Sequence, residues 1–217
     1  MMNLFTPLSW NDTGFILTGI LNTVYISVVA IVIGSLLGLL VGFLRAESNK
    51  TVNVILGTFL DVLRSVPLII QLILFSTFIG VMGFPLPPFF AGAIVLSLYT
   101  MAFMSEVFRS GFNSVPVSMI KAARSLGMNY LQTVRYIRIP IGMRSVFPSW
   151  LGVAQSVIKD SALVSVIGYM ELLRTAEQLI SRTQQPLMIL LGVGLFYFMI
   201  SYPLSRYGKY VERKMEI

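Results

Sequence analysis

The sequence predicts an all-α membrane protein, a polytopic bundle of five transmembrane helices with its N-terminus outside and its C-terminus in the cytoplasm. The 217 residues are 56% hydrophobic and only 12% charged, whereas about 25% of residues are charged in ordinary soluble domains. Two uncharged stretches, 13–44 and 65–105, each exceed the roughly 20 apolar residues that a spanning helix needs. The basic residues gather on one side of the predicted membrane, as they do in membrane proteins.

The first two predicted spans cover about residues 14–44 and 52–82. The first is long enough to tilt in the bilayer, and the polar turn 45–50 follows it. The second contains Pro67. Because proline lacks the backbone N–H of a regular helix, Pro67 predicts a kink or a break within this span.

Three further spans follow, over about 90–108, 146–169 and 186–205. The segment 83–88 precedes the third span and is rich in glycine and proline, which indicates a turn. Lys159 and Asp160 interrupt the fourth span. A segment of mixed polarity, 171–185, leads to the fifth span, and a short charged tail follows it. We expect residues 1–217 to form a single transmembrane domain.

The orientation follows from the basic residues. Five spans place twelve of the sixteen Lys and Arg residues on one side: Arg45, Lys50, Arg109, Lys121, Arg124, Arg135, Arg138, Arg144, Arg206, Lys209, Arg213 and Lys214. The other side holds only Arg174 and Arg182. Since positively charged loops stay in the cytoplasm, the C-terminus is predicted inside and the N-terminus outside. The first thirteen residues lack Lys and Arg, so the N-terminal segment is predicted to be a retained span rather than a signal peptide.

Several kinds of site are excluded by composition. The chain has no cysteine and no histidine, which removes disulfides, thiolate metal sites, the commonest metal ligand and the usual general base. It also lacks a glycine-rich phosphate loop with a lysine. We therefore predict no catalytic residue, no metal site and no cofactor bound by this chain. The net charge of +7 is attributed to membrane orientation and not to nucleic acid.

The longest predicted cytoplasmic segment, 109–144, is expected to form two short helices joined at Gly127. Pro140 is expected to end the second helix. Each helix carries an apolar face larger than a solvated loop needs: Ile120, Ala123 and Leu126 on one, and Leu131, Val134 and Ile137 on the other. Two interpretations remain open, an ordinary basic loop packed on its own bundle or a docking surface for another protein.

A motif in this segment resembles the EAA loop of ABC importer permeases. Lys121-Ala-Ala-Arg-Ser-Leu-Gly127 is followed after nine residues by Ile137-Arg-Ile-Pro140, and the family pattern is E-A-A, three residues, G, nine residues, I-x-L-P. Lys121 and Ile139 depart from it. The resemblance implies a coupling loop over about 112–141 that docks on a cytoplasmic ATPase. The implied contact residues are Lys121, Ala122, Ala123, Leu126, Gly127, Ile137 and Pro140.

Three other segments resemble permeases of the polar amino acid uptake family. They are Val62-Leu-Arg-Ser-Val-Pro-Leu-Ile-Ile-Gln-Leu72, Glu106-Val-Phe-Arg-Ser-Gly111 and Lys159-Asp-Ser-Ala-Leu-Val-Ser-Val-Ile-Gly168. The resemblance implies the type I importer permease fold in a bacterial inner membrane. It also implies a second permease subunit, two cytoplasmic subunits that bind ATP and Mg²⁺, an external solute-binding protein and an amino acid substrate. Importers of another small solute and, as a different class, stand-alone secondary transporters are the alternatives.

Charged residues within predicted spans are candidates for the substrate pathway, because such residues are costly in lipid and often functional. Asp61 and Arg64 are three residues apart and can pair on one helix face. Together with Ser65 and Pro67 they form one candidate set, and Lys159, Asp160 and Ser161 form another. An amino acid needs a donor for its carboxylate and an acceptor for its ammonium group, which these side chains offer. That they only hold helices together is the open alternative.

Gly34, Gly38 and Gly42 form a stripe of small residues along the first span. Such spacing predicts close contact with another helix. The partner helix belongs either to this chain or to a second permease.

Overall fold

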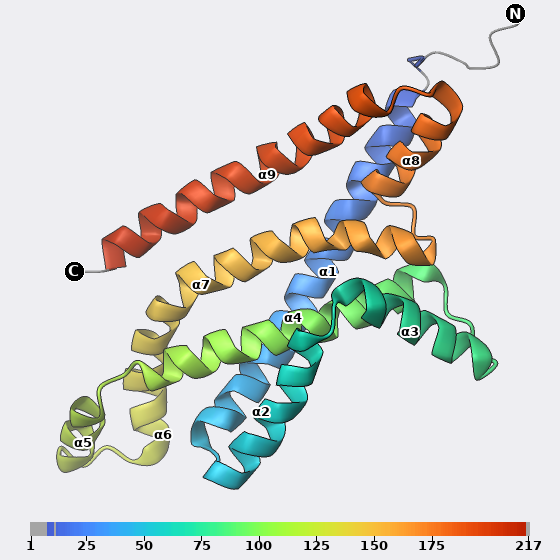
Figure 1. Ribbon diagram of the computed structural model, residues 1–217. Helices are drawn as coiled ribbons and strands as arrows, with labels where there is room; N and C mark the ends of the chain where they lie inside the picture. Colours follow the sequence, from blue (N-terminus) through green and yellow to red (C-terminus); the bar gives the residue numbers. More distant parts are fainter. Residues whose placement is uncertain (1–7, 11, 216–217) are drawn as a thin grey trace, which may run out of the picture. The chain divides into compact units, whose positions relative to one another are not determined.

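The computed structural model describes residues 8–10 and 12–215. These residues form helices and no strand, which confirms the all-α prediction. In chain order the elements of Figure 1 are α1 (Asp12–Glu47), α2 (Lys50–Ser65), α3 (Leu68–Val81), α4 (Pro88–Asn113), α5 (Val117–Ser125), α6 (Tyr130–Thr133), the π-helix η1 (Val134–Arg138), α7 (Ile139–Asp160), the 3₁₀-helix η2 (Ser161–Ile167), α8 (Leu172–Thr183) and α9 (Pro186–Met215). The single-domain prediction includes residues 1–7, 11, 216 and 217, which lie outside the described part, and it stays a prediction.

Helix length and composition agree with five spans. Among the described residues, α1, α4, the continuous helical run 130–167 and α9 are each long and apolar enough to cross a membrane. The helices α2 and α3 meet the same test only when they are taken together as one broken span. The predicted number of spans is thus confirmed if α2 and α3 count as one.

The break between α2 and α3 falls at Pro67, as predicted. Pro67 has φ −54° and ψ 133°, an extended conformation that leaves the helical region. Since its ring nitrogen carries no hydrogen, the helix loses a backbone hydrogen bond there. The Gln71 side chain donates from Nε2 to the Val66 carbonyl oxygen at 2.8 Å, so one carbonyl at the break is satisfied from within the chain.

The fourth span begins earlier than predicted, and the expectation that Pro140 ends a helix is wrong. The helical run is continuous from Tyr130 through α6, η1 and α7. In η1 the chain widens into π-helix, where the Ile139 N–H donates to the Val134 carbonyl, five residues earlier. This wider turn, together with the position of Pro140 in the first turn of α7, lets the helix continue past a residue that lacks an N–H.

The segment 171–185, which we expected to be of mixed polarity, contains the amphipathic helix α8. Gly168, with φ +89°, ends η2, and Glu171 then forms the N-cap of α8. The buried face of α8 consists of Leu172, Thr175, Ala176, Leu179 and Thr183. These positions recur every three to four residues, as expected for a helix with one buried face.

The described chain divides into two compact units, each assembled from separate stretches of the sequence. The first contains the residues up to 31, 66–97 and 155–203. Within it α8 packs along the beginning of α1 (Figure 1). The Leu172 N–H donates to Thr23 Oγ1 at 3.0 Å, and Arg182 Nη2 donates to Asp12 Oδ2 at 2.6 Å. Both ends of α8 are therefore attached to α1.

The second unit contains 32–65, 98–154 and the described residues from 204 onward. Its main core joins Met104, Phe108 and Phe112 of α4 to Val146 of α7. A β-carbon on Gly38 would lie 2.5 Å from Met104 Cβ, and one on Gly42 would lie 2.6 Å from the Ser105 carbonyl oxygen. These two glycines of the predicted stripe thus serve contact with α4 of the same chain.

Candidate functional site

The segment that resembles a coupling loop begins with α5, which follows Pro116 and ends at a glycine. Gly127 has φ +85°, a left-handed conformation that disfavours residues with a β-carbon. Its N–H donates to the Arg124 carbonyl at 3.0 Å, and the Met128 N–H donates to the Ala123 carbonyl at 3.2 Å. This bonding satisfies the last carbonyls of α5 and reverses the chain direction.

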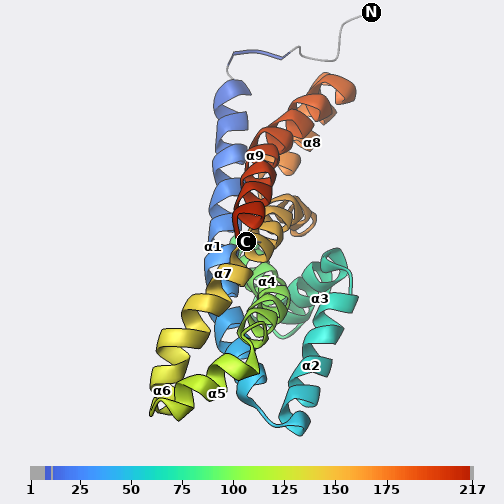
Figure 2. The same cartoon turned by 90° about the vertical axis from the view of Figure 1, so that its left-hand side faces the viewer.

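The chain then enters α6 through a reciprocal cap. Asn129 Oδ1 accepts from the Gln132 N–H at 2.9 Å, and Gln132 Oε1 accepts from the Asn129 N–H at 2.9 Å. This capping box determines where α6 begins. The first short helix and the turn at Gly127 are therefore present as predicted, whereas the second helix is the start of the long run 130–167. Figure 2 shows α5 and α6 side by side within the second unit.

Most of the predicted coupling residues are exposed on this segment. Lys121, Ala122, Gly127 and Pro140 are exposed, Ile137 is half-buried and Ala123 is buried. Leu126 exposes 85% of its surface and Leu131 exposes 74%. The predicted apolar faces are thus divided, with Ala123 and Val134 in the interior and these two leucines outside. Large apolar side chains left uncovered in one place indicate a contact surface for another molecule.

The same surface is basic. Lys121 and Arg124 are both exposed, and no ion pair of either occurs within the described part of the chain. The sequence contains no Asp or Glu between residues 107 and 159. A partner that covers α5 would therefore meet the positive charges of Lys121 and Arg124, neither of which forms an ion pair within the described residues.

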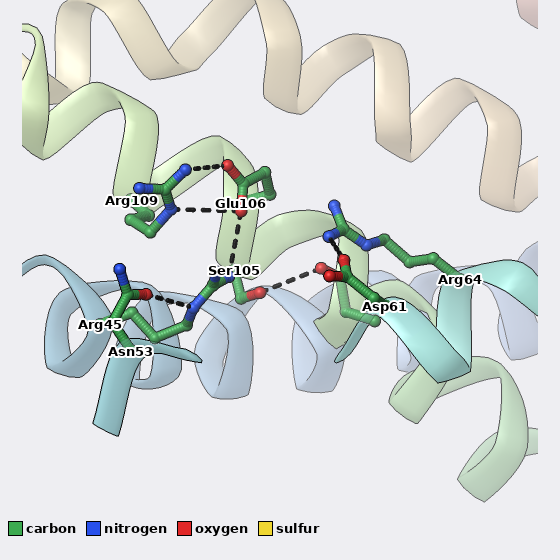
Figure 3. A network of polar contacts seen from close by, with 8 residues as sticks. Arg45, Asn53, Asp61, Arg64, Ser105, Glu106 and Arg109 are labelled. Carbon is green, nitrogen blue, oxygen red and sulfur yellow. Dashed lines mark hydrogen bonds and ion pairs between the residues drawn. The ribbon is translucent and has the colours of Figure 1, made fainter. Parts of the chain in front are cut away.

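The first set of predicted pathway residues lies at the end of α2. Arg64 Nη2 donates to Asp61 Oδ1, which confirms the predicted pair (Figure 3). Asp61 nevertheless leaves 63% of its side chain exposed, and Ser65 and Pro67 are also exposed. The pair is a local contact within one helix face, and it leaves acceptor capacity on the Asp61 carboxylate.

The second set lies where α7 changes into η2, in the first unit. Lys159 is exposed, Asp160 is half-buried and Ser161 is fully buried. Ser161 Oγ donates to the Ile158 carbonyl at 2.8 Å. Helix α3 packs against η2, so the helix that follows Pro67 contacts the segment that begins with Ser161. Within the described residues, neither Lys159 nor Asp160 forms an ion pair.

Two clusters around the end of α1 were missed by the sequence analysis. The Arg45 side chain is 7% exposed and forms an ion pair with Glu106 of α4 at 3.0 Å. Glu106 also pairs with Arg109. Glu47 accepts hydrogen bonds from Tyr130 and Arg138. The only signal in the sequence was a charge at the end of each span, which does not identify partners 61 to 91 residues away.

Glu171 is a buried carboxyl outside the predicted spans. Its Oε2 accepts from the Leu173 N–H at 2.8 Å, and its Oε1 accepts from the Arg174 N–H at 2.7 Å. Burial raises the pKa of this carboxyl to about 7, although the two N–H groups act in the opposite direction. Glu171 therefore caps α8 and titrates near neutral pH.

No group of three or more potential metal ligands occurs among the described residues.

Comparisons with protein families and curated sequences agree on one type of protein. Residues 30–217 match the family model described as "binding-protein-dependent transport system inner membrane component". The arginine transport system permease protein ArtQ of Bacillus subtilis is 31% identical over 99% of both chains. The putative glutamine transport system permease protein GlnP of Rickettsia conorii is 30% identical over 93% of both. The glutamine permease GlnP of Escherichia coli is 29% identical over 96% of both.

Solved structures give the same result for the fold. A chain in the crystal structure of an amino acid ABC transporter with histidines superimposes with a TM-score of 0.85 at 28% identity, covering 96% of this chain and 100% of that one. A chain of the inward-facing MetNI methionine ABC transporter superimposes with a TM-score of 0.81 at 19% identity, covering 96% of this chain and 99% of that one. At that low identity the second likeness shows the shared fold alone.

Proposed function

The chain belongs to the family of binding-protein-dependent transport system inner membrane components, and from this premise we propose that it is the permease subunit of an ATP-driven importer of polar amino acids. An external solute-binding protein delivers the amino acid. Two cytoplasmic ATPase subunits, which bind ATP and Mg²⁺, drive the transport. Two permease subunits, identical or homologous, enclose the pathway in a bacterial inner membrane.

The observation that carries the proposal is the surface of α5 and Gly127. Leu126 is 85% exposed beside a glycine with φ +85°, and Lys121 and Ala122 are exposed one turn earlier. The described residues leave that surface uncovered. A groove on an ATPase subunit would cover it, and the bonds that end α5 hold it in a defined shape.

The test is amino acid uptake into proteoliposomes that contain this chain with its candidate ATPase, permease partner and binding protein. Glutamine, arginine and histidine are offered as labelled substrates. We expect uptake to require ATP and to be abolished by Gly127→Asp, because the new side chain enters the contact and strains the left-handed turn. Copurification of the ATPase measures the contact itself.

Gly83→Asp is the matched control. Gly83 has φ +83°, and a β-carbon on either glycine would meet no atom within 4 Å. The strain and the added charge are therefore the same, but Gly83 belongs to the connection between α3 and α4. Uptake independent of ATP would assign the chain to secondary transporters. Equal effects of the two substitutions would show that α5 has no special role.

We further propose that the two charged sets line the substrate route. Asp61, Arg64, Ser65 and Pro67 form one set, and Lys159, Asp160 and Ser161 form the other. Support comes from the exposure of Asp61 within an apolar span and from the absence of an ion partner for Asp160 among the described residues. Asp160→Asn and Asp61→Asn are expected to lower uptake while the assembly remains intact. Normal uptake by both variants would contradict this role.

A further inference from the structure

The last turn of α1 carries two charged side chains that hold different elements of the second unit. Arg45 contacts α2 and α4, and Glu47 contacts α6 and η1. Residues two apart on a helix point in directions about 200° apart. One rigid helical turn therefore has one cluster on each side.

The Arg45 cluster is enclosed by three helices (Figure 3). Arg45 Nη1 donates to Glu106 Oε2 at 3.0 Å, and its Nε donates to Asn53 Oδ1 at 3.1 Å. A β-carbon on Gly57 would lie 3.1 Å from Arg45 Nη2, so α2 approaches the guanidinium closely. Arg109 donates to both carboxylate oxygens of Glu106, from Nε to Oε2 at 3.2 Å and from Nη2 to Oε1. A buried cation with this many partners has one position relative to α2 and α4.

The Glu47 cluster contacts the coupling segment, the predicted coupling loop over about 112–141. Tyr130 Oη donates to Glu47 Oε2 at 2.5 Å, and Arg138 donates to Oε1. Tyr130 is the first residue of α6 and Arg138 is the last residue of η1. Arg138 is 12% exposed and Glu47 is 27% exposed. A single carboxylate thus holds the first residue of α6 and the last residue of η1, at the beginning of the helical run 130–167.

We propose that the last turn of α1 is a mechanical joint, in which Arg45 and Glu47 are positioning residues that transmit movement of the coupling segment to α2 and α4. The inference rests on the proposed function. When the ATPases move α5 and α6, Glu47 moves with Tyr130 and Arg138. Because Glu47 and Arg45 share one helical turn, the displacement continues to Glu106 and Asn53.

The reconstituted complex tests the joint through three measurements: basal ATP hydrolysis, its stimulation by loaded binding protein, and uptake. Glu47→Gln and Tyr130→Phe each remove part of the connection while they keep the side-chain size. We expect both to retain assembly and basal hydrolysis. Stimulation should fall about fivefold or more, the lower end of typical coupling between distant sites. Charge exchange in the double variant E47R/R138E rebuilds the ion pair but not the bond from Tyr130, and it should restore part of the stimulation that E47R alone loses.

Glu177→Gln is the control, because it neutralises an exposed carboxylate whose partner Arg174 lies three residues away on the same helix. It should leave all three measurements unchanged. Wild-type stimulation in both Glu47→Gln and Tyr130→Phe, with active transport, would overturn the joint and leave the proposed function standing. Wild-type protein without ATP-dependent uptake would refute the proposed function, and the joint with it.

Discussion

Lys121 is the residue at which this chain differs most in charge from the motif it resembles. Its side chain is exposed on α5. We expect Lys121→Glu to weaken binding of the partner ATPase by about two- to tenfold at low salt, because exposed charge pairs contribute up to about 1 kcal/mol and the reversal also adds repulsion. The difference should shrink in about 1 M salt, where the Debye length is about 3 Å. Titration of the ATPase at several salt concentrations measures this.

Lys209→Glu makes the same change in charge on an exposed base near the end of α9. It should leave the affinity for the ATPase unchanged. Equal affinity of wild type and Lys121→Glu at low salt would show that α5 does not meet an acidic surface.

Single residues were predictable from the sequence where the chemistry is local. Gly127 was expected to end a helix, and Asp61 and Arg64 were expected to pair at a spacing of three. The Arg45 and Glu47 clusters were not predictable, because their partners depend on which helices pack together. Nothing in the residues around position 47 identifies Tyr130 or Arg138.

At the scale of elements, the N-terminus of α8 is expected to respond to pH. Burial raises the pKa of Glu171 from an ordinary value near 4.5 to about 7, and the nearby Glu177 carboxylate adds to the rise. The folded state then binds the proton more tightly than the unfolded state. The contribution of Glu171 to stability is therefore fully present below about pH 4.5 and declines as the pH rises to about 7, by up to about 3 kcal/mol.

Thermal unfolding in detergent at pH 5.5 and pH 8 measures this effect, with the lower midpoint expected at pH 8. Glu171→Gln keeps an oxygen acceptor for the N-cap and does not titrate. It should reduce the difference between the two midpoints. A midpoint that rises with pH in wild type, or an unchanged difference in Glu171→Gln, would contradict the assignment.

The helices themselves were largely predictable, and the exceptions have physical causes. Hydrophobic length indicated the spans, which are five when α2 and α3 count as one, and Pro67 marked the break between those two helices. Pro140 misled the prediction because a π-helical turn lets the helix continue through it. The helix α8 was missed because the sequence analysis considered only the mixed polarity of this segment. Its buried face includes Leu172, Ala176, Leu179 and Thr183. A search for helical periodicity would detect this spacing.

At the scale of the whole molecule, the predicted orientation can be tested directly because the sequence contains no cysteine. Single cysteines at Ser125 on α5 and Ser181 on α8 are both placed at exposed positions. An impermeant maleimide should label Ser125→Cys only from the cytoplasmic side and Ser181→Cys only from the outside. Labelling of both from one side would refute the five-span orientation.

Architecture and family were predictable from motifs spread over the chain, and the comparisons confirm both. The roles of the candidate pathway residues were not, because a route through the membrane depends on surfaces that, on the proposed function, a second permease subunit completes. The Asp61 carboxylate illustrates this limit, since the sequence predicts its partner on α2 and not what its exposed side meets.

That exposed carboxylate also bears on how a cell makes the protein. Asp61 leaves 63% of its side chain uncovered by the described residues, and an ionised side chain that faces lipid costs free energy, up to about 2.5–3.5 kcal/mol at the centre of a spanning helix on insertion scales. On the proposed function, an orphan copy synthesised without partner subunits carries this penalty until assembly relieves it. Balanced synthesis of the subunits would limit the number of such unassembled copies. Membrane proteases would recognise the remaining copies by the exposed carboxylate of Asp61.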